Sequence, residues 1–190
     1  MVEDGSREPM KYLQLLPIGM IDGRLLEELG PALARRFRMP CELLPDGFDP
    51  EFAFHPERQQ YHSSEIIARM QSAVGAETWR VLGVTNSDLY IPILTFVFGE
   101  AQLSGSCAVV STHRLTQEFY GLQPDRELLR DRLLKEAVHE LGHTLQLTHC
   151  DDYRCVMAAS HAVEWIDIKD STLCPRCQAR VFTCKQTTEV

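Results

Sequence analysis

The sequence predicts an α/β (α+β) domain in which a twisted mixed sheet is packed with helices. Short apolar runs of strand length alternate with longer stretches of helical periodicity over residues 11–145. The chain has 190 residues, which is enough for one hydrophobic core. No linker divides it, so we expect residues 1–190 to form a single domain. We expect the sheet and helices over about 11–145, followed by a small, irregular C-terminal part over 146–184.

Five apolar runs, each bounded by turn-forming residues, are expected to be strands. They cover residues 11–18, 41–44, 79–85, 93–98 and 107–111. The run Trp79–Thr85 is apolar almost throughout, which indicates a central strand that is buried on both faces. Residues 45–58 and 86–92 are rich in turn formers and are expected to be loops. The small residues within Gly99–Ser106 predict a turn or bulge between the last two strands.

Three stretches of helical periodicity are expected to be helices. They cover about 24–38, 63–74 and 124–145. Asp22 suits the N-cap of the first helix, and Ser63 or Ser64 that of the second. The dipeptide Gly30-Pro31 is expected to kink or split the first helix. Asp125 suits the positively polarised start of the third helix.

The composition argues against several classes of function. The formal net charge is −8 and no basic run appears, so we do not expect nucleic acid as a partner. No apolar stretch approaches the ~20 residues that are needed to span a membrane. The N-terminal residues MVEDGSREPM lack the basic and apolar regions of a signal peptide. We therefore expect a cytoplasmic protein with reduced thiols, and we favour a monomer.

Residues 139–157 read HELGHTLQLTHCDDYRCVM and carry the strongest functional signal. His139 and His143 are four residues apart, so they lie one turn apart on one face of the expected helix. His149 follows six residues later, after that helix has to end. Three imidazoles with one open coordination position are typical of a catalytic zinc site. Glu140 lies beside the first histidine, where it is placed to accept a proton from zinc-bound water.

Four of the seven cysteines form a second metal pattern: Cys150, Cys155, Cys174 and Cys177. In a reducing compartment, such clustering favours a metal over disulfides. Four thiolates are typical of a closed, tetrahedral, structural zinc site. The alternative is a redox C-x-x-C pair, but such a pair usually opens a helix after an N-terminal strand. The remaining cysteines fit no metal pattern: Cys41, Cys107 and Cys184. We expect Cys41 and Cys107 to be buried strand residues.

The combined pattern resembles the metzincin metallopeptidases, whose extended motif reads HExxHxxGxxH and is followed by a methionine turn. The cysteine directly after the third histidine, together with C-P-R-C at 174–177, narrows the resemblance to the archaemetzincins. The segments FVFGEA at 96–101 and AVVSTHRL at 108–115 are also similar to that family.

This resemblance implies a metzincin-like fold and a zinc-dependent peptidase that acts on peptide or protein substrates. The residues that correspond to the ligands of the catalytic zinc are His139, His143 and His149. Glu140 corresponds to the general base, and Met157 to the methionine under the metal. Together with the cysteine cluster, this predicts two zinc ions per chain, one catalytic and one structural. An extended substrate is expected to pair with an edge strand, for which Ile93–Ala101 is the best candidate.

One position departs from the motif, because Gln146 stands where the motif has glycine. A glycine there turns the chain back toward the metal in a left-handed conformation, which is expected to cost a glutamine roughly 1 kcal/mol or more. Tyr153 and His161 are candidates for a second transition-state donor, although a structural role is the simpler interpretation of each.

Two other functions remain open: a non-catalytic two-zinc binding protein and a thiol redox protein. Glu140 favours the enzyme, because a purely structural histidine site has no need of a carboxylate beside its metal.

Overall fold

The computed structural model of the chain describes the backbone of residues 10–186 and the side chains of residues 10–181. Its main sheet consists of β1 (Tyr12–Ile18), β2 (Cys41–Leu43), β5 (Thr78–Thr85), β7 (Gly99–Ala101) and β8 (Cys107–Ser111). These strands lie in the order β2-β1-β5-β8-β7. The first four are parallel, and β7 runs antiparallel to β8 at one edge.

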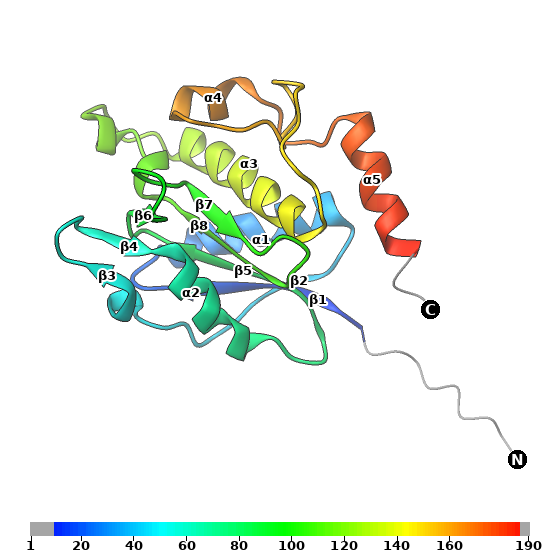
Figure 1. Ribbon diagram of the computed structural model, residues 1–190, viewed down its shortest axis with the longest axis horizontal. Coiled ribbons are helices and arrows are strands. Elements are labelled where there is room, and N and C mark those ends of the chain that lie inside the picture. Colours follow the sequence, from blue (N-terminus) through cyan, green and yellow to red (C-terminus); the bar gives the residue numbers. More distant parts are fainter. Residues whose placement is uncertain (1–9, 187–190) are drawn as a thin grey trace, which may run out of the picture.

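Helices cover both faces of this sheet (Figure 1). The helices α1 (Gly23–Phe37) and α3 (Arg126–Thr144) pack on one face, and α2 (Ser63–Met70) packs on the other. Side chains alternate along β5, so that Leu82 lies in the core under α1 and α3 while Val81 lies in the core under α2. The mixed α/β fold class predicted from the sequence is confirmed, and Trp79–Thr85 lies in the central strand as predicted.

Two smaller units complete the fold. A second sheet contains β3 (Phe54–His55), β4 (Gln60–His62) and β6 (Leu89–Tyr90), in that order. The C-terminal part contains α4 (Val163–Ile168) and α5 (Pro175–Gln186), and α4 lies on the side of α3 that faces away from the main sheet (Figure 1). The C-terminal part is therefore less irregular than the sequence predicts. Single 3₁₀ turns occur at Pro50–Ala53, Gln71–Ala73, His113–Leu115 and Glu118–Tyr120.

The first helix is not split at Gly30-Pro31, which rules out one of the two outcomes expected from the sequence. Pro31 lies inside α1, which runs unbroken to Phe37. A proline inside a helix costs about 3 kcal/mol because it removes one backbone hydrogen bond. Leu29 and Leu33, on either side of it, are both buried against the sheet. Burial of both halves of the helix therefore offsets the loss.

The expected strand at 93–98 is also wrong. Ile93 is 85% exposed, and Val97 makes only an isolated bridge to Leu89. The regular strand begins at Gly99, where a turn or bulge is expected from the sequence. The expected loop at 86–92 in turn contains β6. Most of the apolar residues in 93–98 line a cleft instead of pairing in a sheet.

Neither Ser63 nor Ser64 caps the second helix. The N-cap of α2 is His62, whose side chain makes no capping hydrogen bond. Both serine hydroxyls instead contact the carboxylate of Glu100 in β7, with Ser64 Oγ at 2.8 Å from Oε1. These contacts fasten α2 to the edge strand of the main sheet.

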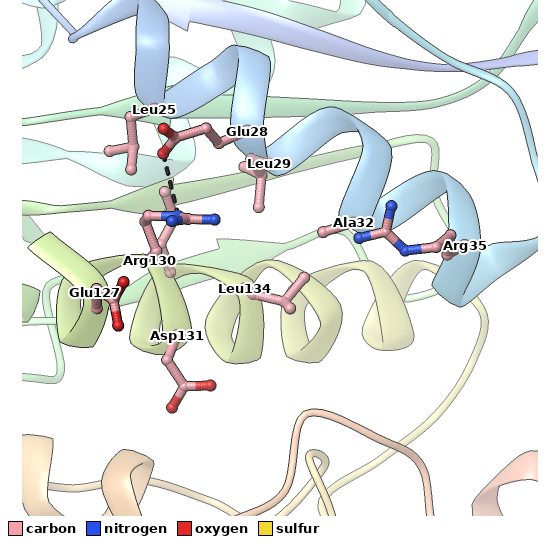
Figure 2. Close-up of a pocket in the computed structure, with 10 residues that line it drawn as sticks. Leu25, Glu28, Leu29, Ala32, Arg35, Glu127, Arg130, Asp131 and Leu134 are labelled. Atoms are coloured by element: carbon pink, nitrogen blue, oxygen red, sulfur yellow. Dashed lines mark ion pairs between the residues drawn. The ribbon is translucent and has the colours of Figure 1, made fainter.

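A groove of about 400 Å³ lies between α1 and α3 (Figure 2). Leu25 and Leu29 of α1 face it, and Arg130 of α3 reaches across to Glu28, with Nε 3.1 Å from the carboxylate. This groove shares no lining residue with the cleft that contains the histidines. The ion pair therefore links the two helices outside that cleft.

Candidate active site

Helix α3 carries His139, Glu140 and His143 into the interior. Asp125 caps its first turn, because its carboxylate accepts a backbone N–H of the helix at 2.9 Å. The helix extends to Thr144, and its last two turns are almost completely buried. The Nε2 atoms of His139 and His143 lie 3.1 Å apart.

A left-handed turn at Gln146 brings the third histidine back to the first two. Gln146 has a φ of 66°, the conformation that the motif normally assigns to glycine. Its N–H donates to the His143 carbonyl at 3.0 Å, and the Leu147 N–H donates to the Gly142 carbonyl at 3.1 Å. The chain therefore reverses directly after α3. One ring nitrogen from each of His139, His143 and His149 lies within 4.8 Å of the others.

Backbone carbonyls orient the two helical imidazoles. Nδ1 of His139 lies 2.8 Å from the Val156 carbonyl oxygen, and Nδ1 of His143 lies 2.7 Å from the Leu147 carbonyl oxygen. A carbonyl oxygen only accepts, so each Nδ1 carries the ring proton and donates it. The two Nε2 lone pairs then face each other and repel unless a cation accepts both. Nitrogens around a tetrahedral zinc lie roughly 3.3–3.4 Å apart, because each Zn–N bond is about 2.0–2.1 Å long. The donor set and the 3.1 Å separation of the His139 and His143 nitrogens therefore fit zinc.

The burial of the site shifts the protonation of its groups. It lowers the pKa of His139 well below the ordinary value, and it also lowers the pKa of His143 and His149. Neutral imidazole is the form that binds a metal. Burial raises the pKa of the Glu140 carboxyl well above its usual range, and the nearby carboxylate of Glu136 raises it further.

A cleft of about 470 Å³ joins the histidines to the edge strand β7. Leu94 and Val97 line its rim, which accounts for the apolar run before β7. Within it, Glu140 packs directly against Gly99. A Cβ atom added at Gly99 would lie 2.6 Å from Cγ of Glu140 and 2.6 Å from the backbone oxygen of Val109, so only glycine fits. The sequence did not reveal this role, because the contact joins residues that lie far apart along the chain.

Met157 packs against Gly142 of the motif helix. Met157 is fully buried, and a Cβ atom added at Gly142 would overlap its sulfur. The glycine inside HELGH therefore leaves the space that the methionine fills. The sequence identifies Met157 but not its partner, since Gly142 in isolation suggests only a weak point in the helix.

The structure also brings together Cys150, Cys155, Cys174 and Cys177, whose sulfur atoms all lie within 4.8 Å of one another. Burial raises the pKa of the Cys150 thiol, but hydrogen bonds from the Asp152 backbone and the Arg176 guanidinium outweigh burial and lower it to about 7. Arg176 Nη2 lies 3.3 Å from the Cys150 sulfur. Four sulfurs at this spacing match the donor set of a closed zinc site.

The other cysteines lie apart from this cluster. Cys41 in β2 is half-buried and Cys107 in β8 is fully buried, and burial raises the pKa of each thiol to about 11. The side chain of Cys184 lies outside the described residues.

Of the two candidate transition-state donors, only His161 borders the cleft. It lines the cleft together with the neighbouring residues 159 and 160. The centroid of its ring lies 5.6 Å from that of Trp165. Tyr153 is 66% exposed and does not line the cleft. Among the described residues, no helix has both the length and the apolar character needed to cross a membrane.

Known proteins resemble this chain over most of its length. Residues 36–182 match peptidase family M54. An archaemetzincin from Methanocaldococcus jannaschii is 41% identical, covering 85% of this chain and 87% of that protein. The crystal structure of archaemetzincin from Archaeoglobus fulgidus, complexed with malonate, is similar with a TM-score of 0.78 and 35% identity, over 89% of this chain and 99% of that one.

A second solved structure, that of archaemetzincin from Methanopyrus kandleri, has a TM-score of 0.79 and 32% identity, over 98% of this chain and 99% of that one. These similarities confirm the resemblance inferred from the sequence. The chain therefore belongs to peptidase family M54, the archaemetzincins, and is a zinc metallopeptidase.

Proposed function

We propose that this peptidase cleaves peptide bonds at a zinc ion held by His139, His143 and His149, with Glu140 as the general base. The observation that carries the proposal is the convergence of three ring nitrogens within 4.8 Å, in the cleft that Glu140 also lines. The substrates are peptides or proteins.

The zinc ion and the residues around it have different roles in the proposed reaction. A zinc ion at these nitrogens supplies Lewis acidity, which acidifies water and polarises a carbonyl group. Glu140 accepts a proton from the attacking water on a carboxylate oxygen and then delivers it to the amine that leaves. The carbonyls of Val156 and Leu147 hold the imidazoles in the required tautomer. Met157, which packs against Gly142 between the two helical histidines, is proposed to be the methionine under the metal.

The edge strand β7 is proposed to align the substrate. Phe98 and Gln102 direct their backbone hydrogen bonds to β8. Because the direction alternates along a strand, the backbone groups of Gly99 and Ala101 face the open edge. An extended peptide that pairs with this edge passes over Glu140, which packs against Gly99.

A second, structural zinc is proposed for the cysteine cluster, which gives two zinc ions per chain. Cys150 directly follows His149, so a metal that fixes the thiolate also restrains the third imidazole. The proposed role is therefore mechanical, since four thiolates leave no open position for a substrate.

Two measurements test this proposal. Elemental analysis should find two zinc ions per chain, and a single ion would remove one of the proposed sites. Glu140→Ala should keep the fold and both metals, and it should slow peptide hydrolysis by at least ~10²–10⁴-fold. Glu127→Ala, on the same helix but facing the α1–α3 groove, is the matched control and should retain activity. A fully active Glu140→Ala enzyme would refute the assigned base.

A further inference from the structure

A lysine is fully buried in the C-terminal part, beside the last turns of the motif helix. Lys169 has no exposed side-chain surface, and its ammonium lies 2.7 Å from Oε1 of Glu136, which is itself 4% exposed. Glu136 lies one helical turn before His139 and lines the same cleft. No step proposed for hydrolysis uses either side chain.

The same ammonium supports the segment that orients the histidines. Lys169 Nζ also donates to the backbone carbonyl of Ala158 at 3.4 Å. The two preceding carbonyls hold the metal site: that of Val156 accepts from His139 Nδ1 at 2.8 Å, and that of Met157 accepts from the Cys150 N–H at 2.9 Å. Three consecutive carbonyls, at residues 156–158, thus connect to the first histidine, to the neighbour of the third histidine and to Lys169.

Stability alone does not explain this ion pair. Removing two charges from water costs several kcal/mol per ion, and apolar residues of similar volume often stabilise a protein as well or better. The ion pair does, however, connect two segments whose relative position sets the geometry of the metal site. Glu136 belongs to α3, which carries two of the histidines, and Ala158 belongs to the segment that orients them.

We propose that Lys169, anchored by Glu136, is a positioning residue of the histidine metal site, because it holds carbonyls 156–158 at a fixed distance from α3. This inference rests on the proposed zinc-binding role of the histidines. Outer groups that orient metal-binding imidazoles typically change metal affinity or activity by about 10–100-fold when they are lost.

The test is the double variant Lys169→Met/Glu136→Met, which removes both charges and preserves both volumes. Zinc affinity of the histidine site is measured by chelator competition with the cysteine site loaded, and the visible spectrum is recorded after cobalt substitution. We expect a folded protein whose zinc affinity at the histidines is weakened by ~10–100-fold, with a shifted cobalt spectrum and a lower kcat.

The matched control is Lys135→Met/Asp131→Asn. Lys135 is also a buried lysine with a carboxylate partner, at 2.6 Å, and it contacts the C-terminal part through the Asp167 carbonyl at 3.2 Å. It does not contact carbonyls 156–158. Its removal should lower stability without changing zinc affinity or the cobalt spectrum.

The outcomes separate this inference from the proposed function. A Lys169→Met/Glu136→Met protein that folds and keeps the wild-type zinc affinity and spectrum would overturn the positioning role. If the double variant does not fold, Glu136→Asp is used instead, because the shorter side chain keeps both charges and draws the Lys169 ammonium away from Ala158. Unchanged zinc affinity in Glu136→Asp also overturns the positioning role. If the wild-type protein binds no metal at its histidines, it is the proposed function that fails.

Discussion

Adding one methyl group at Gly99 should slow the enzyme without removing any polar group. A Cβ atom there would lie 2.6 Å from Cγ and 2.8 Å from Oε1 of Glu140, whereas ordinary contacts begin at 3.4 Å. The Glu140 side chain, or the β7 backbone, must therefore move by about 0.8 Å, the difference between 2.6 and 3.4 Å. A misplacement of about 1 Å can cost on the order of 10²-fold in rate, so we expect Gly99→Ala to lower kcat/KM by roughly 10–100-fold.

The assay is hydrolysis of a fluorogenic peptide at saturating zinc, together with zinc content and urea unfolding. Gly99→Ala should retain both metals, because Gly99 is not one of the proposed ligands. It should also lose about 1–3 kcal/mol of stability, since the added carbon also lies 2.6 Å from the backbone oxygen of Val109. Gly23→Ala, at the start of α1 with no atom within 4 Å of the new carbon, is the matched control. Wild-type kcat/KM in Gly99→Ala would refute the claim that Glu140 depends on this contact.

Four further changes have defined outcomes. Gln146→Gly should raise the free energy of unfolding by up to about 1 kcal/mol. The left-handed conformation costs glutamine ~1–2 kcal/mol, whereas glycine loses only ~0.5–1 kcal/mol more in conformational entropy on folding. A fall in the thermal midpoint would contradict this prediction. Gly142→Ala should destabilise the protein by ~1–3 kcal/mol through its clash with Met157, although alanine normally favours a helix. Unchanged urea unfolding would show that Met157 does not need the space left by the missing side chain. Cys177→Ser should weaken zinc binding at the histidines as well as at the cysteines, measured by competition, and loss of one zinc alone would count against the mechanical link. Dialysis against a chelator should abolish hydrolysis and added zinc should restore it, whereas activity that survives dialysis would exclude a zinc-dependent reaction.

Local sequence patterns were sufficient to predict the helices and strands whose signals lie within a few residues. Leucines at helical spacing and Asp125 predict the motif helix, and the apolar run Trp79–Thr85 predicts the central strand. They were insufficient where tertiary packing overrides the local preference of a residue for helix or strand. Pro31 lies inside an unbroken helix because both flanking halves are buried. Residues 94–98 line the cleft, and within the described part of the chain their only strand-like pairing is an isolated bridge from Val97 to Leu89.

The sequence by itself determined the family and named the candidate donors, because three histidines, four cysteines and a methionine at this spacing form a pattern that rarely arises by chance. Only the tertiary structure decided how those donors are held. The packing of Gly99 against Glu140, of Gly142 against Met157 and of Lys169 against Glu136 joins segments that are distant in sequence. No local periodicity encodes such contacts, since they depend on how the edge strand, the motif helix and the C-terminal part pack together.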